Sequence, residues 1–256
     1  MANGKLEALL AEWRQKRLLI LGLGVSNRPL ARLLLEAGCR VTGCDRTDRE
    51  KLDREVLDLE EQGLELRLGA GYLENLEADV VFRTPGMHPA NPALEALRRR
   101  GAAVTSEMEI FFQVCPCPVI AVTGSDGKTT TTTLLAEMLR AAGKTVWVGG
   151  NIGKPLLPEV GRMAPSDWAV VELSSFQLMD MDRSGHIAVV TNLAPNHLDV
   201  HKDMAEYVEA KEHVFAYQSE GDILILNRDH DWILFHPVHP LHPIQLLRPG
   251  SDQMQY

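Results

Sequence analysis

The chain has 256 residues, which is enough for one large domain or two ordinary ones. Its 45% hydrophobic and 24% charged residues are typical of a soluble globular protein. The formal net charge of −9 argues against binding to nucleic acid or to an anionic membrane, so a phosphate ligand would need cations placed near it.

The sequence shows no signal peptide and no apolar run of transmembrane length. We therefore expect a cytoplasmic protein without membrane insertion. The cysteines have no C-x-x-C spacing, and reduced thiols are the simplest interpretation of them. They are Cys39, Cys44, Cys115 and Cys117.

The first part of the chain alternates strands with helices, which predicts an α/β fold with a mainly parallel sheet. A helix over 5–15, a strand over 17–21, a helix that ends at Gly38 and a strand over 40–44 open the series. The turn after the first strand has G-x-G at Gly22 and Gly24, and Asp45 follows about 20 residues later, as in dinucleotide folds. Asn27 replaces the third glycine, so the turn indicates phosphate or ribose contact more than NAD. A tight turn without a ligand is the alternative.

The elements that follow complete a first domain over residues 1–115. We predict a charged helix over 48–62, strands over 64–68 and 79–82, a helix from its Asn91 cap to Arg100, a strand near Val104 and a helix over 106–113. The loop 84–89 comes after a strand, at the edge where open α/β sheets bind ligands. The run Cys-Pro-Cys-Pro at 115–118 marks the domain boundary.

A second domain, predicted over 116–228, opens with a buried strand over 119–122, a glycine turn and a helix from Lys128. A helix that begins there directs free backbone N–H groups at the turn, which makes an anion site. Lys128 adds a cation for a β- or γ-phosphate, and the Thr129 hydroxyl is placed to ligate Mg²⁺. Val122 replaces the first glycine of the full Walker pattern, and a chance Gly-Lys-Thr is the alternative. We predict ATP or GTP binding by Gly124, Ser125, Asp126, Gly127, Lys128, Thr129 and Thr130.

Strands are also predicted over 145–148, 168–171, 186–190 and 222–226, with a glycine-rich loop over 149–153 and a helix capped by Asp203. Glu172 follows one of these strands, as a carboxylate that holds Mg²⁺ near phosphates would, although an acidic cap in a turn is the alternative. His197 and Lys211 carry no signal of their own. An exposed loop histidine and a surface lysine are the ordinary interpretations.

The character of the chain changes at about residue 229. Three His-Pro pairs exclude a regular helix, and the histidine spacing fits no metal-ligand pattern. We predict an irregular tail over 229–256, either disordered or read from a shifted frame.

Five motifs are T-G-S-D-G-K-T-T at 123–130, G-N-I-G at 150–153, E-L-S-S-F-Q-L at 172–178, N-L-A-P-N-H-L-D at 192–199 and A-K at 210–211. Together they resemble the Mur ligases, the ATP-dependent amide-forming enzymes of peptidoglycan precursor synthesis. The resemblance covers about residues 5–228. It implies an amino-terminal Rossmann-like UDP-binding domain and part of a P-loop Mur ligase central domain. The family's carboxy-terminal domain is absent, so we expect an incomplete ligase.

The resemblance also implies roles for individual residues. The catalytic set is Lys128, Asn151, Glu172, His197 and Lys211. The metal ligands are Thr129, Glu172, His197 and Lys211, the last after carbamylation, since a carbamate carries two hard oxygens that suit Mg²⁺. The UDP-substrate residues are Gly24, Val25, Ser26, Asp45, Arg46, Thr47, Thr84, Gly86, Asn151, Ser174 and Gln177.

Within the family, E-L-S-S-F-Q-L and the short first domain most resemble the member that adds D-glutamate. The implied ligands are ATP, Mg²⁺, UDP-N-acetylmuramoyl-L-alanine and D-glutamate. The resemblance also implies that the protein is a monomer. The implied reaction moves the γ-phosphoryl group to the alanyl carboxylate, and the amine of D-glutamate then attacks the acyl phosphate. The alternatives are a fragment that binds UDP-sugar or ATP without turnover, a Mur ligase for another amino acid, and a generic P-loop hydrolase.

Overall fold

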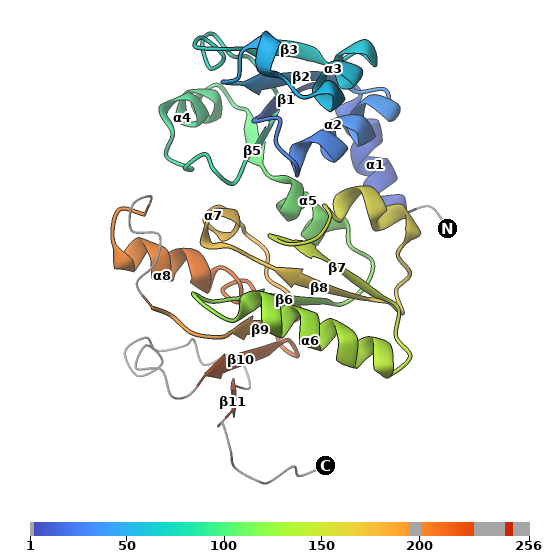
Figure 1. Cartoon of the computed structure of the whole chain (residues 1–256), viewed down its shortest axis with the longest axis vertical. Coiled ribbons are helices and arrows are strands. Elements are labelled where there is room, and N and C mark those ends of the chain that lie inside the picture. Colours follow the sequence, from blue (N-terminus) through green and yellow to red (C-terminus); the bar gives the residue numbers. More distant parts are fainter. Residues whose placement is uncertain (1–2, 195–200, 228–243, 248–256) are drawn as a thin grey trace. The chain divides into compact units, whose positions relative to one another are not determined.

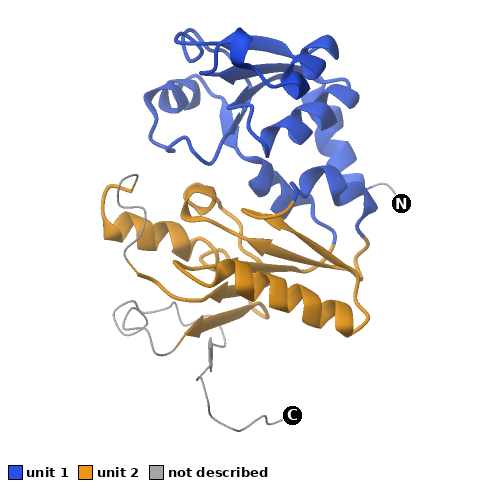
Figure 2. Cartoon of the chain, in the orientation of Figure 1, with its two compact units in different colours: residues 1–116, 154–163 blue, residues 117–153, 164–256 orange. Residues whose placement is uncertain are grey.

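The computed structural model describes residues 3–194, 201–227 and 244–247 (Figure 1). The chain forms two compact units (Figure 2). The first contains Met1–Pro116 and Lys154–Met163, and the second contains Cys117–Gly153 and Ala164–Tyr256. The first unit thus ends next to the boundary predicted from the sequence. It also includes the segment 154–163, which the sequence places in the second domain.

The first unit is built on a five-stranded parallel sheet of order β3-β2-β1-β4-β5. Its central strand, β1, is buried from Leu18 to Leu21, as expected for a sheet covered on both faces. Because parallel strands end at one edge of a sheet, the turns after β1, β2 and β4 lie at the same edge. The strands are β1 (Arg17–Leu21), β2 (Arg40–Asp45), β3 (Glu65–Leu68), β4 (Val80–Arg83) and β5 (Ala103–Thr105).

The helices of this unit bury apolar faces against the sheet, and Asn91 caps α4 with Pro92 at its start, as predicted. The single helix predicted over 48–62 is wrong. Leu52 and Asp53 are extended there, with ψ of 142° and 147°, and Asp53 forms an ion pair with Arg28 instead of continuing the helix. The helices are α1 (Gly4–Trp13), α2 (Asn27–Glu36), η1 (Arg49–Lys51), α3 (Arg54–Glu61), α4 (Pro92–Arg99), α5 (Glu107–Val114) and η2 (Leu157–Arg162).

The second unit contains a six-stranded parallel sheet of order β11-β10-β9-β6-β8-β7. Every residue of β6 is buried, as the run of apolar residues predicts. Leu135 and Leu139 pack against the core below α6, whereas Met138 is 68% exposed. The elements are β6 (Val119–Thr123), α6 (Lys128–Ala141), β7 (Val146–Gly150), β8 (Trp168–Glu172), α7 (Ser175–Leu178), β9 (Ile187–Val190), α8 (Met204–Glu212), β10 (Ile223–Asn227) and β11 (Ile244–Leu247).

Strand β11 corrects the prediction of an irregular tail over 229–256. It pairs in parallel with β10, with Leu224 opposite Ile244. The segment lies beyond the three His-Pro pairs, so no proline removes a donor from this ladder. The rest of the tail lies outside the described residues. Among the helices of the described ranges, none has the length and apolar character needed to cross a membrane.

Candidate active site

A cavity of about 540 Å³ lies at the carboxyl edge of the first sheet. Its volume falls within the usual range for small-ligand sites. Arg28, Arg46 and His88 are among its lining residues, and the guanidinium of Arg46 offers positive charge to an anionic ligand. Val25, which is 74% exposed, and Ser26 belong to the same glycine turn but not to the lining. The predicted UDP-binding residues that do line it are Gly24, Asp45, Arg46, Thr47, Thr84 and Gly86.

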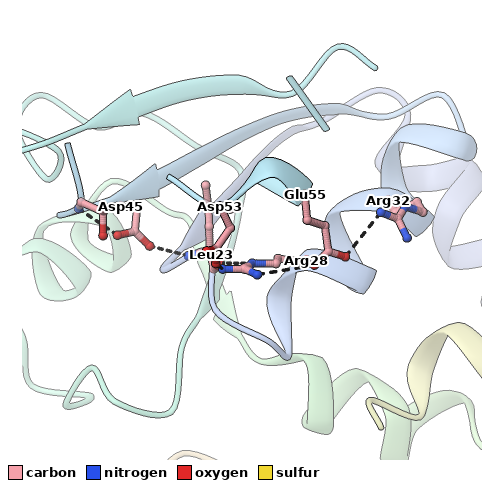
Figure 3. A network of polar contacts seen from close by, with 7 residues as sticks. Leu23, Arg28, Arg32, Asp45, Asp53 and Glu55 are labelled. Atoms are coloured by element: carbon pink, nitrogen blue, oxygen red, sulfur yellow. Dashed lines mark hydrogen bonds and ion pairs between the residues drawn. The ribbon is translucent and has the colours of Figure 1, made fainter. Parts of the chain in front are cut away.

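Asp45 fixes the glycine turn beside this cavity (Figure 3). Its Oδ2 accepts the backbone N–H of Leu23 at 2.7 Å, and its Oδ1 accepts the backbone N–H of Thr47 at 2.9 Å. Burial alone would raise the pKa of Asp45, but these backbone hydrogen bonds outweigh it and hold the pKa below its ordinary value. The carboxylate therefore stays ionised and joins the ends of β1 and β2.

Arg28 and Arg83 shape the cavity, and neither is predicted from the sequence. Arg28 donates from Nε to the carbonyl O of Leu23 at 2.8 Å and forms ion pairs with Asp53 and Glu55 (Figure 3). Arg83 is only 2% exposed and donates to the carbonyl O of Met87 at 3.2 Å, within the loop that lines the cavity.

The phosphate loop of the second unit has the geometry that its glycines predict. Gly124 and Gly127 have φ of 145° and 76°, in the region that favours glycine. A Cβ on Gly124 would lie 2.0 Å from Oγ1 of Thr191, so no other residue fits there. Lys128 begins α6, and its Nζ donates to the carbonyl oxygens of Gly124 and Ser125 at 3.0 and 2.8 Å. The Lys128 ammonium group therefore lies against the backbone of the phosphate loop.

Glu172 joins two other predicted residues. Its carboxylate is buried, with Oε2 accepting the Thr129 hydroxyl at 2.7 Å and Oε1 accepting the Asn151 amide at 2.8 Å. A carboxylate beside a hydroxyl at the phosphate loop is a pair of hard oxygens, which fits Mg²⁺. Within the described ranges, no group of three or more His, Cys, Asp or Glu residues could hold a metal. Glu172 and Thr129 are therefore the two predicted ligands that the described residues bring together.

Lys211 is not the surface lysine that its helix position alone suggests. It is 3% exposed, its Nζ donates to the carbonyl O of Gly124 at 2.9 Å, and it lies 4.7 Å from the ring centre of Tyr207. Burial, and then the nearby charge of Lys128, lowers the pKa of Lys211 to about 7. Its amine therefore belongs to the phosphate-loop site. His197, the other predicted ligand, lies outside the described residues.

Three predicted residues have their side chains engaged in the framework of the second unit. The Ser125 hydroxyl donates to the carbonyl O of Ala194 at 2.9 Å and lies 2.9 Å from the Tyr207 hydroxyl. Ser174 and Gln177 form a capping box on α7, with Gln177 Oε1 accepting the N–H of Ser174 at 3.0 Å. Thr130 lies exposed in the first turn of α6.

The residues that hold the phosphate loop from the end of β9 and from α8 were given no individual role from the sequence. They are Thr191, Asn192 and Tyr207. Two signals were available, because Asn192 opens the motif 192–199, and Thr191 and Asn192 directly follow a strand that neighbours β6. Such residues lie at the carboxyl edge with the loop.

Comparison with known proteins agrees with this geometry. Residues 122–239 match the model of the Mur ligase middle domain. The chain is 50% identical over 219 residues to the UDP-N-acetylmuramoylalanine–D-glutamate ligase of Clostridium novyi, a match that covers 85% of the chain and 48% of the relative. The enzyme of the same name from Clostridium botulinum is 51% identical over the same length. The chain thus spans about half the length of the curated relatives it matches.

Solved structures share the fold. The UDP-N-acetylmuramate:L-alanyl-gamma-D-glutamyl-meso-diaminopimelate ligase of Neisseria meningitides matches with a TM-score of 0.58 at 21% identity, over 90% of this chain and 77% of that one. The UDP-N-acetylmuramate-alanine ligase of Thermotoga maritima matches with a TM-score of 0.50 at 21% identity, over 85% and 50% of the two chains. With the sequence match of its middle domain, the α/β architecture and the Thr129–Glu172 pair at the phosphate loop, the chain belongs to the Mur ligase family.

Proposed function

We propose that this chain provides the UDP-substrate and ATP sites of an ATP-dependent ligase that adds D-glutamate to UDP-N-acetylmuramoyl-L-alanine in the cytoplasm, as a monomer. The observation that carries the proposal is the buried Glu172 carboxylate, bonded to Thr129 and Asn151 at the start of a phosphate-loop helix. The roughly half-identical relatives, all named for this D-glutamate ligation, support the choice of amino acid.

The residues of the second unit would bind and orient the triphosphate. The N–H groups at the start of α6 and the Lys128 ammonium lie where they can offset charge on the γ-phosphoryl group as it moves to the substrate carboxylate. Glu172 and Thr129 would hold Mg²⁺, which neutralises phosphate charge when bound. No protein nucleophile is needed, because the amine of D-glutamate attacks the acyl phosphate directly. Catalysis would rest on positioning and electrostatics.

The cavity of the first unit would hold the UDP part of the substrate. Asp45 fixes the glycine turn that lines it, Thr84 lies in the facing loop, and Arg46 brings positive charge to its wall. The glycine fingerprint of NAD-binding folds is incomplete here, because Asn27 replaces the third glycine. The Asn27 side chain donates to the carbonyl O of Gly22 at 2.8 Å and so belongs to the turn itself. The turn therefore suits UDP better than NAD.

Carbamylation of Lys211 belongs to the same proposal. Without modification, this buried group shares the Gly124 carbonyl with Lys128, and its protonated form adds a second positive charge beside the loop. A carbamate, formed when the neutral amine attacks CO₂ and releases a proton to solvent, would instead place an anion there, which would attract the Lys128 ammonium and a divalent cation.

The proposal is tested by supplying the purified chain with ATP, Mg²⁺, UDP-N-acetylmuramoyl-L-alanine and D-glutamate and detecting the D-glutamyl product by mass spectrometry. Product formation would establish that the chain is itself a ligase. Binding of UDP and ADP without product would instead support a binding module without turnover. Binding of neither nucleotide would refute both.

A further inference from the structure

Asn192, directly after the strand β9, contacts the phosphate loop through every polar group of its side chain. Its Oδ1 accepts the backbone N–H groups of Ser125 at 3.1 Å and Asp126 at 2.8 Å. Its Nδ2 donates to the carbonyl O of Asp126 at 3.3 Å. Its backbone carbonyl also accepts the N–H of Ser125 at 2.9 Å. One residue therefore satisfies both polar backbone groups of Asp126.

These contacts divide the donors of the loop into two sets. The N–H groups of Ser125 and Asp126 point to Asn192, so they are directed at protein oxygens. The N–H groups of Lys128, Thr129 and Thr130 form the first turn of α6, where a helix offers no carbonyl partner. These groups are the ones that an anion at the helix start would use.

We propose that Asn192 is a positioning residue for nucleotide binding, which holds residues 125–126 so that the first turn of α6 faces the phosphates. The inference rests on the proposed nucleotide site but adds a residue that touches the loop and not the nucleotide.

The neighbouring residue reinforces this arrangement. The Thr191 hydroxyl donates to the carbonyl O of Asp126 at 2.6 Å, and Thr191 lies against Gly124 with no room for a Cβ. The loop is therefore held against 191–192 from Gly124 to Asp126. Without the Asn192 side chain, the Ser125 N–H keeps the Asn192 backbone carbonyl, but the Asp126 N–H loses its partner and would compete for phosphate oxygens or turn toward water.

The experiment measures the affinity for Mg²⁺–ADP and, separately, for UDP by titration calorimetry in the purified chain. Asn192→Ala should weaken ADP binding by about tenfold or more, because it removes the three hydrogen bonds between this side chain and the loop. UDP affinity should stay unchanged, because its proposed cavity is built by the first unit. Thr133→Ala, at an exposed polar residue of α6, is the matched control and should leave both affinities unchanged.

The outcomes separate the inference from the proposed function. If the unaltered chain does not bind ADP, the proposed nucleotide site fails. If it does bind ADP and Asn192→Ala binds equally well, the positioning role fails and the site stands. If Asn192→Ala does not fold, Asn192→Ser decides, because one short hydroxyl cannot serve both N–H groups. A several-fold loss of ADP affinity with normal UDP affinity would then support the role, and normal affinity for both would overturn it.

Discussion

Lys128 and Lys211 donate to the same backbone carbonyl oxygen, that of Gly124, at 3.0 and 2.9 Å. Two ammonium groups on one acceptor repel each other, which contributes to the lowered pKa of Lys211 after the larger effect of burial. This carbonyl is reached by side chains from both α6 and α8. The fold therefore brings together one lysine suited to phosphate and one suited to modification.

Replacing Lys211 tests the second of these roles. In a full-length ligase that contains this chain, Lys211→Ala should abolish most activity, because the anionic ligand formed from the lysine would be lost. Short carboxylates such as acetate should restore part of the activity by supplying oxygens in the vacated space. The measurement is the rate of product formation with and without the added carboxylate. Full activity of the variant without rescue would remove Lys211 from the site.

Replacing Lys128 tests the phosphate loop. Lys128→Ala should weaken ATP binding by about 10- to 100-fold, since a hydrogen bond from a charged group contributes about 1.5–3 kcal/mol. Titration calorimetry with Mg²⁺–ATP gives this value, and UDP affinity in the same variant reports whether the chain is still folded. An unchanged ATP affinity would refute the assignment of this loop to phosphate binding.

Asp45 gives the matching test in the first unit. Asp45→Asn keeps the size of the side chain but retains only one oxygen for the N–H groups of Leu23 and Thr47. The amide NH₂ would face one of these donors, so the turn should open and UDP affinity should fall by about tenfold. Calorimetry with UDP measures the change, and ADP affinity should not move. A variant with normal UDP affinity would show that the turn does not depend on this carboxylate.

Gly150 is predicted to tolerate no side chain. Its φ is 97°, and a Cβ would lie 2.1 Å from the backbone O of Glu172, in the strand that carries the carboxylate. Gly150→Ala should reduce the free energy of unfolding by about 2–4 kcal/mol, through strain and a displaced strand end. Gly161→Ala is the matched control, since nothing lies within 4 Å of its added Cβ. Urea denaturation of both variants checks this, and equal stability would contradict the close approach.

The buried carboxyl group of Glu107 should make the stability of the chain depend on pH. Burial raises the pKa of Glu107 from 4.5 to about 7. The hydrogen bond that Oε1 accepts from the N–H of Leu157 at 2.9 Å lowers the pKa, but its effect is smaller than that of burial. Between these two values the folded chain binds more protons than the unfolded chain, so its stability should fall as pH rises from 4.5 to 7. The loss attributable to this group is up to about 3 kcal/mol and is complete above pH 7.

Denaturation curves at several pH values measure this effect. Glu107→Gln cannot ionise, and its stability should change less over the same range than that of the unaltered chain. Glu95→Gln, at an exposed position of α4, should keep the original pH dependence. Parallel curves for the unaltered chain and Glu107→Gln would show that Glu107 does not titrate in this window.

Local pattern was enough to predict the two sheets and most of their helices. Buried apolar runs such as 119–122 predicted strands, and caps such as Asn91 predicted helix starts. The failures were in short elements whose conformation depends on distant partners. The break at Asp53 coincides with its ion pair to Arg28, and β11 exists through its pairing with β10. No periodicity within these segments could reveal such partners.

The site residues divide in the same way, into those that local sequence predicts and those that depend on contacts with distant parts of the chain. Thr129 and Glu172 were predictable because their residue types and their places after strands carry the chemistry. Lys211 required family resemblance, since its burial is set by the packing of α8 and not by its neighbours in the chain. Asn192 and Arg83 were given no individual role, although Asn192 opens one of the five motifs, because asparagine and arginine are common in loops and at strand ends. Only the contacts across the fold show what they hold.

The assignment of Lys154–Met163 to the first unit has a topological consequence. The chain passes between the units at 116/117, 153/154 and 163/164, so no single cut separates them. A recombinant piece ending at Pro116 would lose η2, expose the apolar surface that Leu157 and Val160 bury, and leave the Glu107 carboxyl without the backbone N–H of Leu157. The two units are interleaved in sequence. When one unit unfolds, it therefore frees an end of a segment that belongs to the other unit.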